Sequence, residues 1–200
     1  MVSCPLCKQD EWVLNQIKKG FFVEVGSGDG VHHSNTLRLE QAGWTGLLIE
    51  PLPDLFHASC RVRKCAHYCG AAFSEPSECS FLRGKGTGWT YSGILQTMPA
   101  AWKEEHLRRD SQFLSVRTQT LSTIMLHMRC PETVDYLSLD TEGSELEILK
   151  TWIDDEVFKT RLMTVEFRYD ALFLEELCRT LTGYQFVKVE GYDAFFQLAV

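Results

Sequence analysis

The sequence has no long apolar run, little proline and no excess of positive charge. Its 200 residues include 6 prolines, and 27 aspartates and glutamates outnumber 20 lysines and arginines, for a formal charge of −7. No apolar stretch reaches the roughly 18–20 residues that cross a bilayer, so we expect no membrane-spanning helix. The acidic balance disfavours nucleic acid as a partner, although a local basic patch is compatible with it.

The N-terminus also lacks a basic stretch followed by an apolar one. We therefore expect no secretion signal, a cytoplasmic protein, and eight reduced cysteines rather than a disulfide framework. Cys4 and Cys7 have the spacing of half a zinc site, but the other cysteines and His67 are irregularly spaced. Two interpretations of Cys4 and Cys7 stay open, a pair of zinc ligands and an exposed pair of thiols.

What is present is ordinary for one globular domain, with 44% hydrophobic, 24% charged and 12% aromatic residues. Short apolar runs alternate with amphipathic segments, which predicts a mostly parallel sheet with helices on both faces. The sequence predicts an α/β fold with a seven-stranded sheet that ends in an antiparallel hairpin. The expected strands are 21–25, 46–49, 66–73, 134–139, 162–167, 184–189 and 194–200.

Segment 74–115 interrupts this alternation. It is rich in glycine, serine and tryptophan, and its periodicity is weak apart from one expected helix over 100–109. Segments of this length in compact domains are commonly lids or binding segments. We therefore predict a single domain over 1–200, with a helix and the cysteine pair in 1–20 and a lid over the ligand in 74–115.

The clearest local motif is the turn Gly26-Ser27-Gly28-Asp29-Gly30, which directly follows an expected strand that carries Glu24. Glycines let the backbone turn sharply and approach a ligand closely. The spacing differs from that of dinucleotide sites, and an acid inside the strand suits a cationic ligand better than a pyrophosphate. Glu50 ends the next strand, where a carboxylate can accept both hydroxyls of a ribose. The alternative is an ordinary strand-to-helix turn.

A second group of acids, Asp140, Glu142 and Glu145, follows the expected strand 134–139. Ligands of such sheets bind beyond the carboxyl ends of the strands, where these carboxylates can act as a general base or as metal ligands. Glu145 is equally well explained as a cap of the following helix. Asp140, at the strand tip, is the best-placed site residue.

These motifs together resemble the FkbM-like methyltransferases, a branch of the class I S-adenosylmethionine-dependent enzymes. The resemblance implies a Rossmann-like class I methyltransferase fold. It also implies O-methyl transfer from S-adenosylmethionine (SAM) to a hydroxyl of a sugar, another small molecule or a glycan. The matching stretches are FVEVGSGDGVHHSNTLRLEQAGWTGLLIEPLP (22–53), CGAAFSE (69–75), VDYLSLDTEGSELEILK (134–150) and VEF (165–167).

The resemblance also assigns the cofactor residues by motif position. It implies that Glu50 binds the ribose, Ala71 borders the adenine and Asp140 faces the sulfonium. The methionine part of SAM would be held by Glu24, Gly26, Ser27, Gly28, Asp29, Gly30 and Asn35. His32 and His33 depart from the usual family pattern.

The base is less well defined than the cofactor residues. A hydroxyl acceptor needs a base or a metal ion to remove its proton. The expected catalytic residues are Asp140, His33 and Glu142, with His32 beside His33. Asp140 and Glu142, joined by Glu166, are alternatively the ligands of a divalent metal ion. The sequence alone does not choose between these roles.

The sequence gives less support to two other functions. A cap-ribose RNA methyltransferase would be expected to carry a Lys-Asp-Lys-Glu constellation, which is not apparent, and the net charge is unfavourable. A non-catalytic methyltransferase-fold domain for scaffolding or trafficking is disfavoured by the intact glycine turn and by Glu24 and Glu50. The aromatic residues Trp89, Tyr91 and Trp102 either stack on the acceptor or pack within the lid. The oligomeric state is not predicted.

Overall fold

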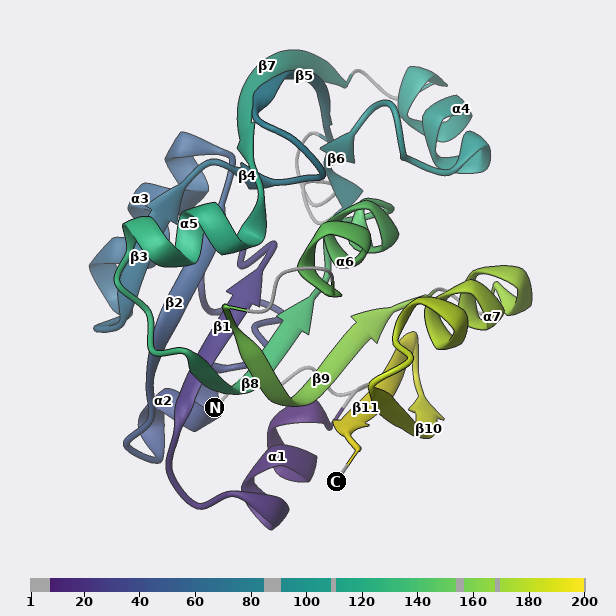
Figure 1. The fold of residues 1–200 in the computed structure, drawn as a ribbon. Helices are drawn as coiled ribbons and strands as arrows, with labels where there is room; N and C mark the ends of the chain where they lie inside the picture. The colour runs from purple at the N-terminus through teal and green to yellow at the C-terminus, as the bar shows by residue number, and fades with distance from the viewer. Residues whose placement is uncertain (1–7, 85–90, 109–110, 154–156, 168–169, 200) are drawn as a thin grey trace.

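The computed structural model describes residues 8–84, 91–108, 111–153, 157–167 and 170–199. Its larger sheet has seven strands in the order β10-β11-β9-β8-β1-β2-β3 (Figure 1). Five strands are parallel, and β11 lies antiparallel between β9 and β10. The prediction of a mostly parallel seven-stranded sheet with a terminal hairpin is confirmed. The strands are β1 (Phe21–Val25), β2 (Thr45–Glu50), β3 (Ala66–Cys69), β8 (Thr133–Leu139), β9 (Lys159–Glu166), β10 (Tyr184–Glu190) and β11 (Asp193–Leu198).

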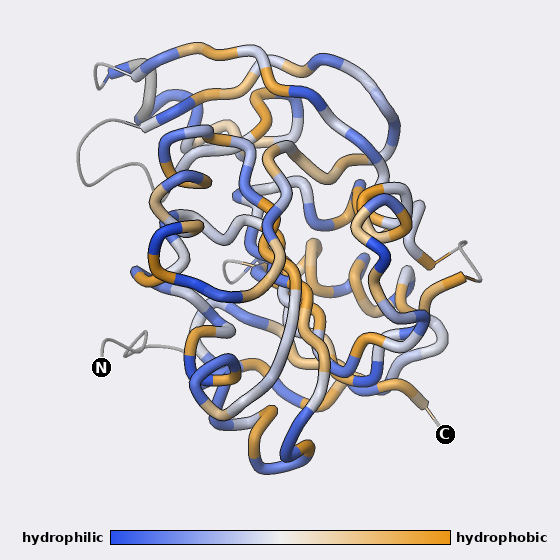
Figure 2. The backbone as a smooth tube through the Cα atoms, turned by 90° about the vertical axis from the view of Figure 1, so that its left-hand side faces the viewer, coloured by the Kyte–Doolittle hydropathy of each residue, from blue (hydrophilic) through white to orange (hydrophobic). Residues whose placement is uncertain are grey.

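Two separate hydrophobic clusters cover the two faces of this sheet. Phe22 and Tyr136 pack with Val13 of α1 and Leu39 of α2, whereas their strand neighbours pack with α5, α6 and α7. Figure 1 shows α1 and α2 on the opposite side of the strands from α5 and α6, and Figure 2 shows hydrophobic stretches running through the centre of the molecule. The helices are α1 (Gln9–Gln16), α2 (Leu37–Gln41), α3 (Pro53–Val62), α5 (Leu121–His127), α6 (Glu145–Ile153) and α7 (Ala171–Thr180).

A second sheet includes parts of the segment that the sequence suggested to be irregular. It comprises β4 (Ala71–Ala72), β5 (Ser77–Arg83), β6 (Gly93–Ile94) and β7 (Gln112–Gln119), in the order β4-β7-β5-β6. The prediction of weak regular structure in 74–115 is therefore wrong, although the expected helix is present as α4 (Ala100–Arg108). The expected strand 66–73 is also wrong as a single strand.

The break in that strand occurs at Gly70. Its backbone N–H donates to the carbonyl of Glu50, which ends the pairing of β3 with β2. The chain then leaves the larger sheet, and β4 pairs in parallel with β7. This crossover places the second sheet beyond the carboxyl ends of β1 and β2 (Figure 1).

A small apolar cluster and one ion pair attach the second sheet to the rest of the domain. Leu52, which follows β2, is buried with Phe81 and Val116 of the second sheet. Arg83 of β5 forms a two-point ion pair with Asp54 at the start of α3. The second sheet therefore stands directly over the edge where ligands of such folds bind.

The described helices and cysteines bear on two further expectations. No helix within the described ranges is long and apolar enough to cross a membrane. The six cysteines within these ranges are free thiols. Burial raises the pKa of Cys65 to about 12, and that thiol lies against the apolar cluster beside α1 and α2. Cys4 and Cys7, the expected zinc pair, lie outside the described residues.

Candidate active site

A cavity of about 400 Å³ lies where the carboxyl ends of the parallel strands meet the second sheet. Gly26, Glu50, Asp140 and Glu166 contribute the wall on the side of the larger sheet, one from the end of each of four neighbouring strands. The second sheet and the chain around it contribute Ala71, Phe81, Tyr91, Ile94 and Trp102. The cavity therefore lies at the position that the fold class predicts for a ligand.

The glycine turn forms the floor of this cavity. Gly26 has a φ of +84°, and a Cβ built on it would lie 1.8 Å from the carbonyl oxygen of Asp140. No side chain fits there, so the close approach of the turn to the Asp140 backbone requires glycine at position 26. Gly26, Ser27 and Gly28 line the cavity. Ser27 is 3% exposed, and its hydroxyl has no hydrogen-bond partner within the described part of the chain. A buried hydroxyl of this kind at a cavity wall is suited to a ligand partner.

Glu50 closes one side of the turn. Its two carboxylate oxygens accept hydrogen bonds from the backbone N–H groups of Gly28, at 2.8 Å, and Leu52, at 2.9 Å. Burial raises the pKa of Glu50 to about 7, against the lowering effect of these two N–H groups. Each carboxylate oxygen retains acceptor capacity, so the group can still take two hydroxyl hydrogens. This donor–acceptor pattern fits a ribose diol.

Glu24 lies one layer behind the cavity wall. Its buried carboxylate accepts from the Ser34 hydroxyl at 3.0 Å, from the Asn35 backbone N–H at 2.7 Å and from the Thr36 hydroxyl. Burial raises the pKa of Glu24, and the Arg63 guanidinium, 3.9 Å away, opposes that shift. Glu24 therefore fixes the segment that carries Asn35 instead of facing the cavity itself.

Arg63 is a functional residue that the sequence did not reveal. Its side chain is fully buried, and it donates to the Gly30 carbonyl at 2.8 Å, to the Ser34 hydroxyl at 3.0 Å and to Glu40 at 2.5 Å. It thereby links the far end of the glycine turn to α3. No local pattern marks this arginine, because its partners are 23–33 residues away.

Asn35 is the residue of this segment that reaches the cavity wall. Its side-chain amide donates to the Ser138 hydroxyl of β8 at 2.9 Å. Its backbone N–H is occupied by Glu24. These two contacts fix Asn35 between β1 and β8, beside the turn.

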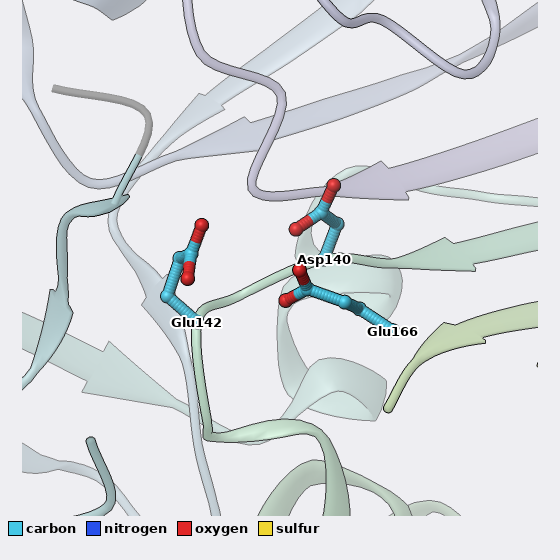
Figure 3. A group of neighbouring side chains, drawn as sticks. All are labelled: Asp140, Glu142 and Glu166. Carbon is cyan, nitrogen blue, oxygen red and sulfur yellow. The ribbon is translucent and has the colours of Figure 1, made fainter. Parts of the chain in front are cut away.

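Three carboxylates converge at the ends of β8 and β9, beside the glycine turn. Oxygen atoms of Asp140, Glu142 and Glu166 lie within 4.8 Å of one another. Figure 3 shows Glu142 on one side of the space between them and Asp140 and Glu166 on the other. Burial, together with the charges of Asp140 and Glu145, raises the pKa of Glu166 well above its ordinary value. The group could share a proton or hold a divalent cation, which prefers oxygen ligands.

Glu145 has the capping role that the sequence allowed. Its carboxylate accepts from the backbone N–H groups of Thr141, at 2.7 Å, and Gly143, at 3.0 Å, and from the Thr141 hydroxyl at 2.9 Å. It braces the loop that carries Glu142, whose φ of +64° is unusual for a non-glycine residue. Glu145 positions this loop and is not part of the cavity wall.

Two histidines and two aromatic rings complete the wall. His32 and His33 both line the cavity, and the Nδ1 atom of His32 lies 2.6 Å from a carboxylate oxygen of Asp29. Tyr91 and Trp102 stack on each other, with ring centroids 4.7 Å apart and an angle of 18° between the rings. Trp89, the third aromatic residue considered from the sequence, lies outside the described residues.

The structure brings most of the expected site residues together. Glu24, Asp29 and Gly30 lie behind the wall, where they hold its residues in place. The expected residues that line the cavity are Gly26, Ser27, Gly28, His33, Asn35, Glu50, Ala71, Asp140 and Glu142.

The comparison that decides the family is a match over residues 24–191 to the family model described as the methyltransferase FkbM domain. The chain belongs to the FkbM methyltransferase family. The match begins at Glu24 and includes every residue that lines the cavity except Gln9 of α1 and Tyr192 and Asp193 at the turn between β10 and β11. For an FkbM methyltransferase domain, SAM is the methyl donor expected in general, and the cavity-lining glycine turn, the Ser27 hydroxyl and the Glu50 carboxylate fit that ligand.

A solved structure shares the fold. The crystal structure of methyltransferase FkbM from Methylobacillus flagellatus KT superposes with a TM-score of 0.53 at 10% sequence identity. The match covers 91% of this chain and 44% of that chain, so the FkbM domain described here spans less than half the length of that protein. A search of curated protein sequences found no significant match.

Proposed function

We propose that this chain is a SAM-dependent O-methyltransferase that acts on a hydroxyl of a sugar, another small molecule or a glycan. The observation that carries the proposal is one cavity that is lined by chemically different groups. The glycine turn and Glu50 lie at the ends of β1 and β2, the carboxylates lie at the ends of β8 and β9, and the stacked rings belong to the chain around the second sheet. A group-transfer enzyme needs such an arrangement, because donor and acceptor must meet in one water-poor space.

The donor side suits SAM in shape and charge. Gly26, Gly28 and Ser27 leave backbone and hydroxyl groups available beside the tip of β1. Glu50 can accept the two ribose hydroxyls, and Ala71 is small enough to border a flat adenine ring. The nearby carboxylate of Asp140 favours a cationic sulfonium by charge.

The acceptor side suits a molecule without phosphate groups. Asp140, Glu142 and Glu166 lie close together there, and the described cavity wall contains no lysine or arginine. A phosphate-rich acceptor would be repelled by these carboxylates, which makes the alternative of an RNA substrate less well supported. The stacked Tyr91 and Trp102 offer an aromatic face to a ring of a sugar or a similar small molecule.

The carboxylate cluster could serve the reaction in two ways. Its members could orient the acceptor hydroxyl directly, or they could hold a divalent cation that polarises it. Dialysis against a chelator, followed by turnover measurements with and without added Mg²⁺ or Mn²⁺, distinguishes the two. If turnover survives dialysis, the carboxylates orient the acceptor hydroxyl directly. If only the added metal ion restores turnover, the carboxylates hold a metal ion.

The proposed function is tested first by binding and then by turnover. Titration calorimetry with SAM and with S-adenosylhomocysteine should give micromolar dissociation constants. Release of S-adenosylhomocysteine is then followed with a panel of methyl glycosides and alicyclic alcohols, and with a capped RNA oligonucleotide. Absence of binding at millimolar SAM would leave only a non-catalytic scaffold or trafficking role, and turnover on the RNA alone would reassign the substrate.

A further inference from the structure

We propose that His32, oriented by Asp29, is the base that accepts the proton of the acceptor hydroxyl. This inference rests on the proposed function, since it concerns the same cavity and the same transfer. Its geometry is independent of any ligand. His32 Nδ1 lies 2.6 Å from Asp29 Oδ2, and the His32 side chain is 62% exposed at the cavity mouth.

Asp29 is well fixed for this role. Its other carboxylate oxygen, Oδ1, accepts from the backbone N–H groups of Val31, at 2.9 Å, and His32, at 2.8 Å. Burial raises the pKa of Asp29, but the hydrogen bonds from His32 and from the two N–H groups outweigh burial and leave the pKa below its ordinary value. Asp29 is therefore ionised at neutral pH, and its carboxylate accepts a hydrogen bond from the Nδ1–H group of His32.

The hydrogen bond at Nδ1 determines what the other ring nitrogen can do. A neutral histidine has one N–H and one lone pair, and a carboxylate at Nδ1 selects the tautomer with the proton there. Nε2 then carries the lone pair, and none of the described residues forms a hydrogen bond to it. The imidazole of this cavity-lining, solvent-exposed residue is thus prepared as a base.

The proposed step balances without any further reagent. His32 Nε2 takes the proton of the acceptor hydroxyl while that oxygen forms a bond to the methyl carbon. The bond between the methyl carbon and sulfur breaks, and its electron pair stays on sulfur. The proton held by His32 then leaves to solvent through the exposed side of the ring, which returns the imidazole to its starting tautomer.

His33 is the obvious competitor, because it also lines the cavity. Within the described ranges no carboxylate lies at ion-pair distance from His33, so nothing fixes its tautomer. Its backbone adopts a φ of +59°, in the left-handed region. His33 therefore shapes the turn after Asp29, whereas His32 has the oriented ring. The other titratable residues that line the cavity are Glu50, Asp140, Glu142, Glu166, Asp193, Tyr91 and Tyr192.

The decisive variant is His32→Asn. The asparagine amide can still donate to Asp29, so the loop keeps its hydrogen bond while the base is removed. With the best acceptor of the glycoside and alcohol panel, kcat should fall by about 10²–10⁴-fold. The dissociation constant for SAM should stay within about twofold of wild type. His57→Asn, an exposed histidine on α3 outside the cavity, is the matched control and should leave both values unchanged.

Two results of this comparison would overturn the proposal. A tenfold or greater loss of SAM affinity in His32→Asn would assign Asp29 and His32 to cofactor binding. Full turnover in His32→Asn, with a large loss in His33→Asn, would assign the base to the neighbouring histidine.

A second measurement needs neither SAM nor an acceptor. Nitrogen-15 spectra of the free protein at pH 8 should show the neutral His32 ring protonated at Nδ1, and Asp29→Asn should shift it toward a mixture of both tautomers. A wild-type ring protonated mainly at Nε2 contradicts the proposal. If wild type turns over no acceptor, the proposed function fails, and the tautomer still decides whether Asp29 orients His32.

Discussion

Gly26 and Asp140 meet backbone to backbone, so close that a Cβ on Gly26 would lie 1.8 Å from the Asp140 carbonyl oxygen. The two residues follow β1 and β8, which are neighbours in the sheet, and the Asp140 N–H donates to the carbonyl of Val25 at 3.1 Å. The glycine turn and the first carboxylate of the cluster are therefore fixed relative to each other by the strands themselves. The contact between Gly26 and Asp140 therefore connects the proposed SAM-binding turn with the carboxylate cluster.

Substitution of Gly26 by alanine should break that contact. The added methyl group collides with backbone, which cannot rotate away, and the φ of +84° is unfavourable for alanine. We expect the free energy of unfolding to fall by about 3 kcal/mol and SAM affinity to fall by at least about 100-fold. Chemical denaturation and calorimetry measure the two effects. Gly183→Ala is the control, because nothing lies within 4 Å of a Cβ at that position.

Glu50 should make both stability and SAM binding depend on pH. Its carboxyl has a pKa of about 7 in the folded protein, because of burial, against an ordinary value of 4.5. Between these values the folded state holds a proton at Glu50 that the unfolded state has lost. The stabilising contribution of Glu50 is therefore complete below about pH 4.5 and is lost as pH rises through 7. The contribution of Glu50 is on the order of 3 kcal/mol.

Denaturation of the free protein from pH 5 to 8 tests this expectation. Glu50→Gln should reduce the decline by about 3 kcal/mol, the share of Glu50, while the exposed Glu132→Gln should retain it in full. The raised pKa values of the buried Glu24 and Glu166 account for a decline that remains in Glu50→Gln. Ribose hydroxyls that donate to the Glu50 carboxylate would favour its ionised form, so SAM binding near pH 6.5 should release a proton. Calorimetry in two buffers with different ionisation enthalpies detects that proton. The same binding enthalpy in both buffers would show that Glu50 does not titrate on binding.

The larger sheet could be predicted because its chemistry is local. Phe22 and Val23 are neighbours that enter opposite hydrophobic clusters, so β1 is apolar on both faces and is recognisable as a buried parallel strand. The sequence did not indicate the second sheet, because β5 begins with exposed polar residues. A long connection also separates β5 from its partner strand β7. The alternation of Leu114, Val116 and Thr118 in β7 was a usable signal, since the last two are buried.

The candidate site likewise contains residues whose position the sequence predicts and residues whose role it does not. Gly26, Glu50 and Asp140 are each adjacent in sequence to the end of a strand, so the fold class alone brings them together. The roles of Glu24 and Arg63 depend on contacts between α3, β1 and the segment before α2, which no spacing rule specifies. Asp29 and His32 are only three residues apart in the sequence. That spacing is equally compatible with an exposed histidine that has no partner, so the sequence does not specify the 2.6 Å hydrogen bond between them.

Arg63 should be among the most sensitive positions for stability. Arg63→Met leaves Glu24 buried without its cation and removes the link between α3 and the Gly30 carbonyl. Breaking a buried ion pair from one side costs about 3–5 kcal/mol. The control, Arg179→Met, removes an exposed pair with Glu175 on α7 and should cost less than about 1 kcal/mol. Similar losses in the two variants, measured by urea denaturation, would contradict the role given to Arg63.

Trp102 should affect the acceptor and not the donor. It lies on the cavity wall contributed by the chain around the second sheet, stacked on Tyr91. Trp102→Ala removes the aromatic face, and we expect KM for the acceptor to rise about tenfold, consistent with about 1.4 kcal/mol of lost stacking and burial. SAM affinity should stay within about twofold. Phe113→Ala, an exposed aromatic residue of β7 that does not line the cavity, should change neither value. A loss of SAM affinity in Trp102→Ala with the acceptor KM unchanged would place the adenine, not the acceptor, against these stacked rings.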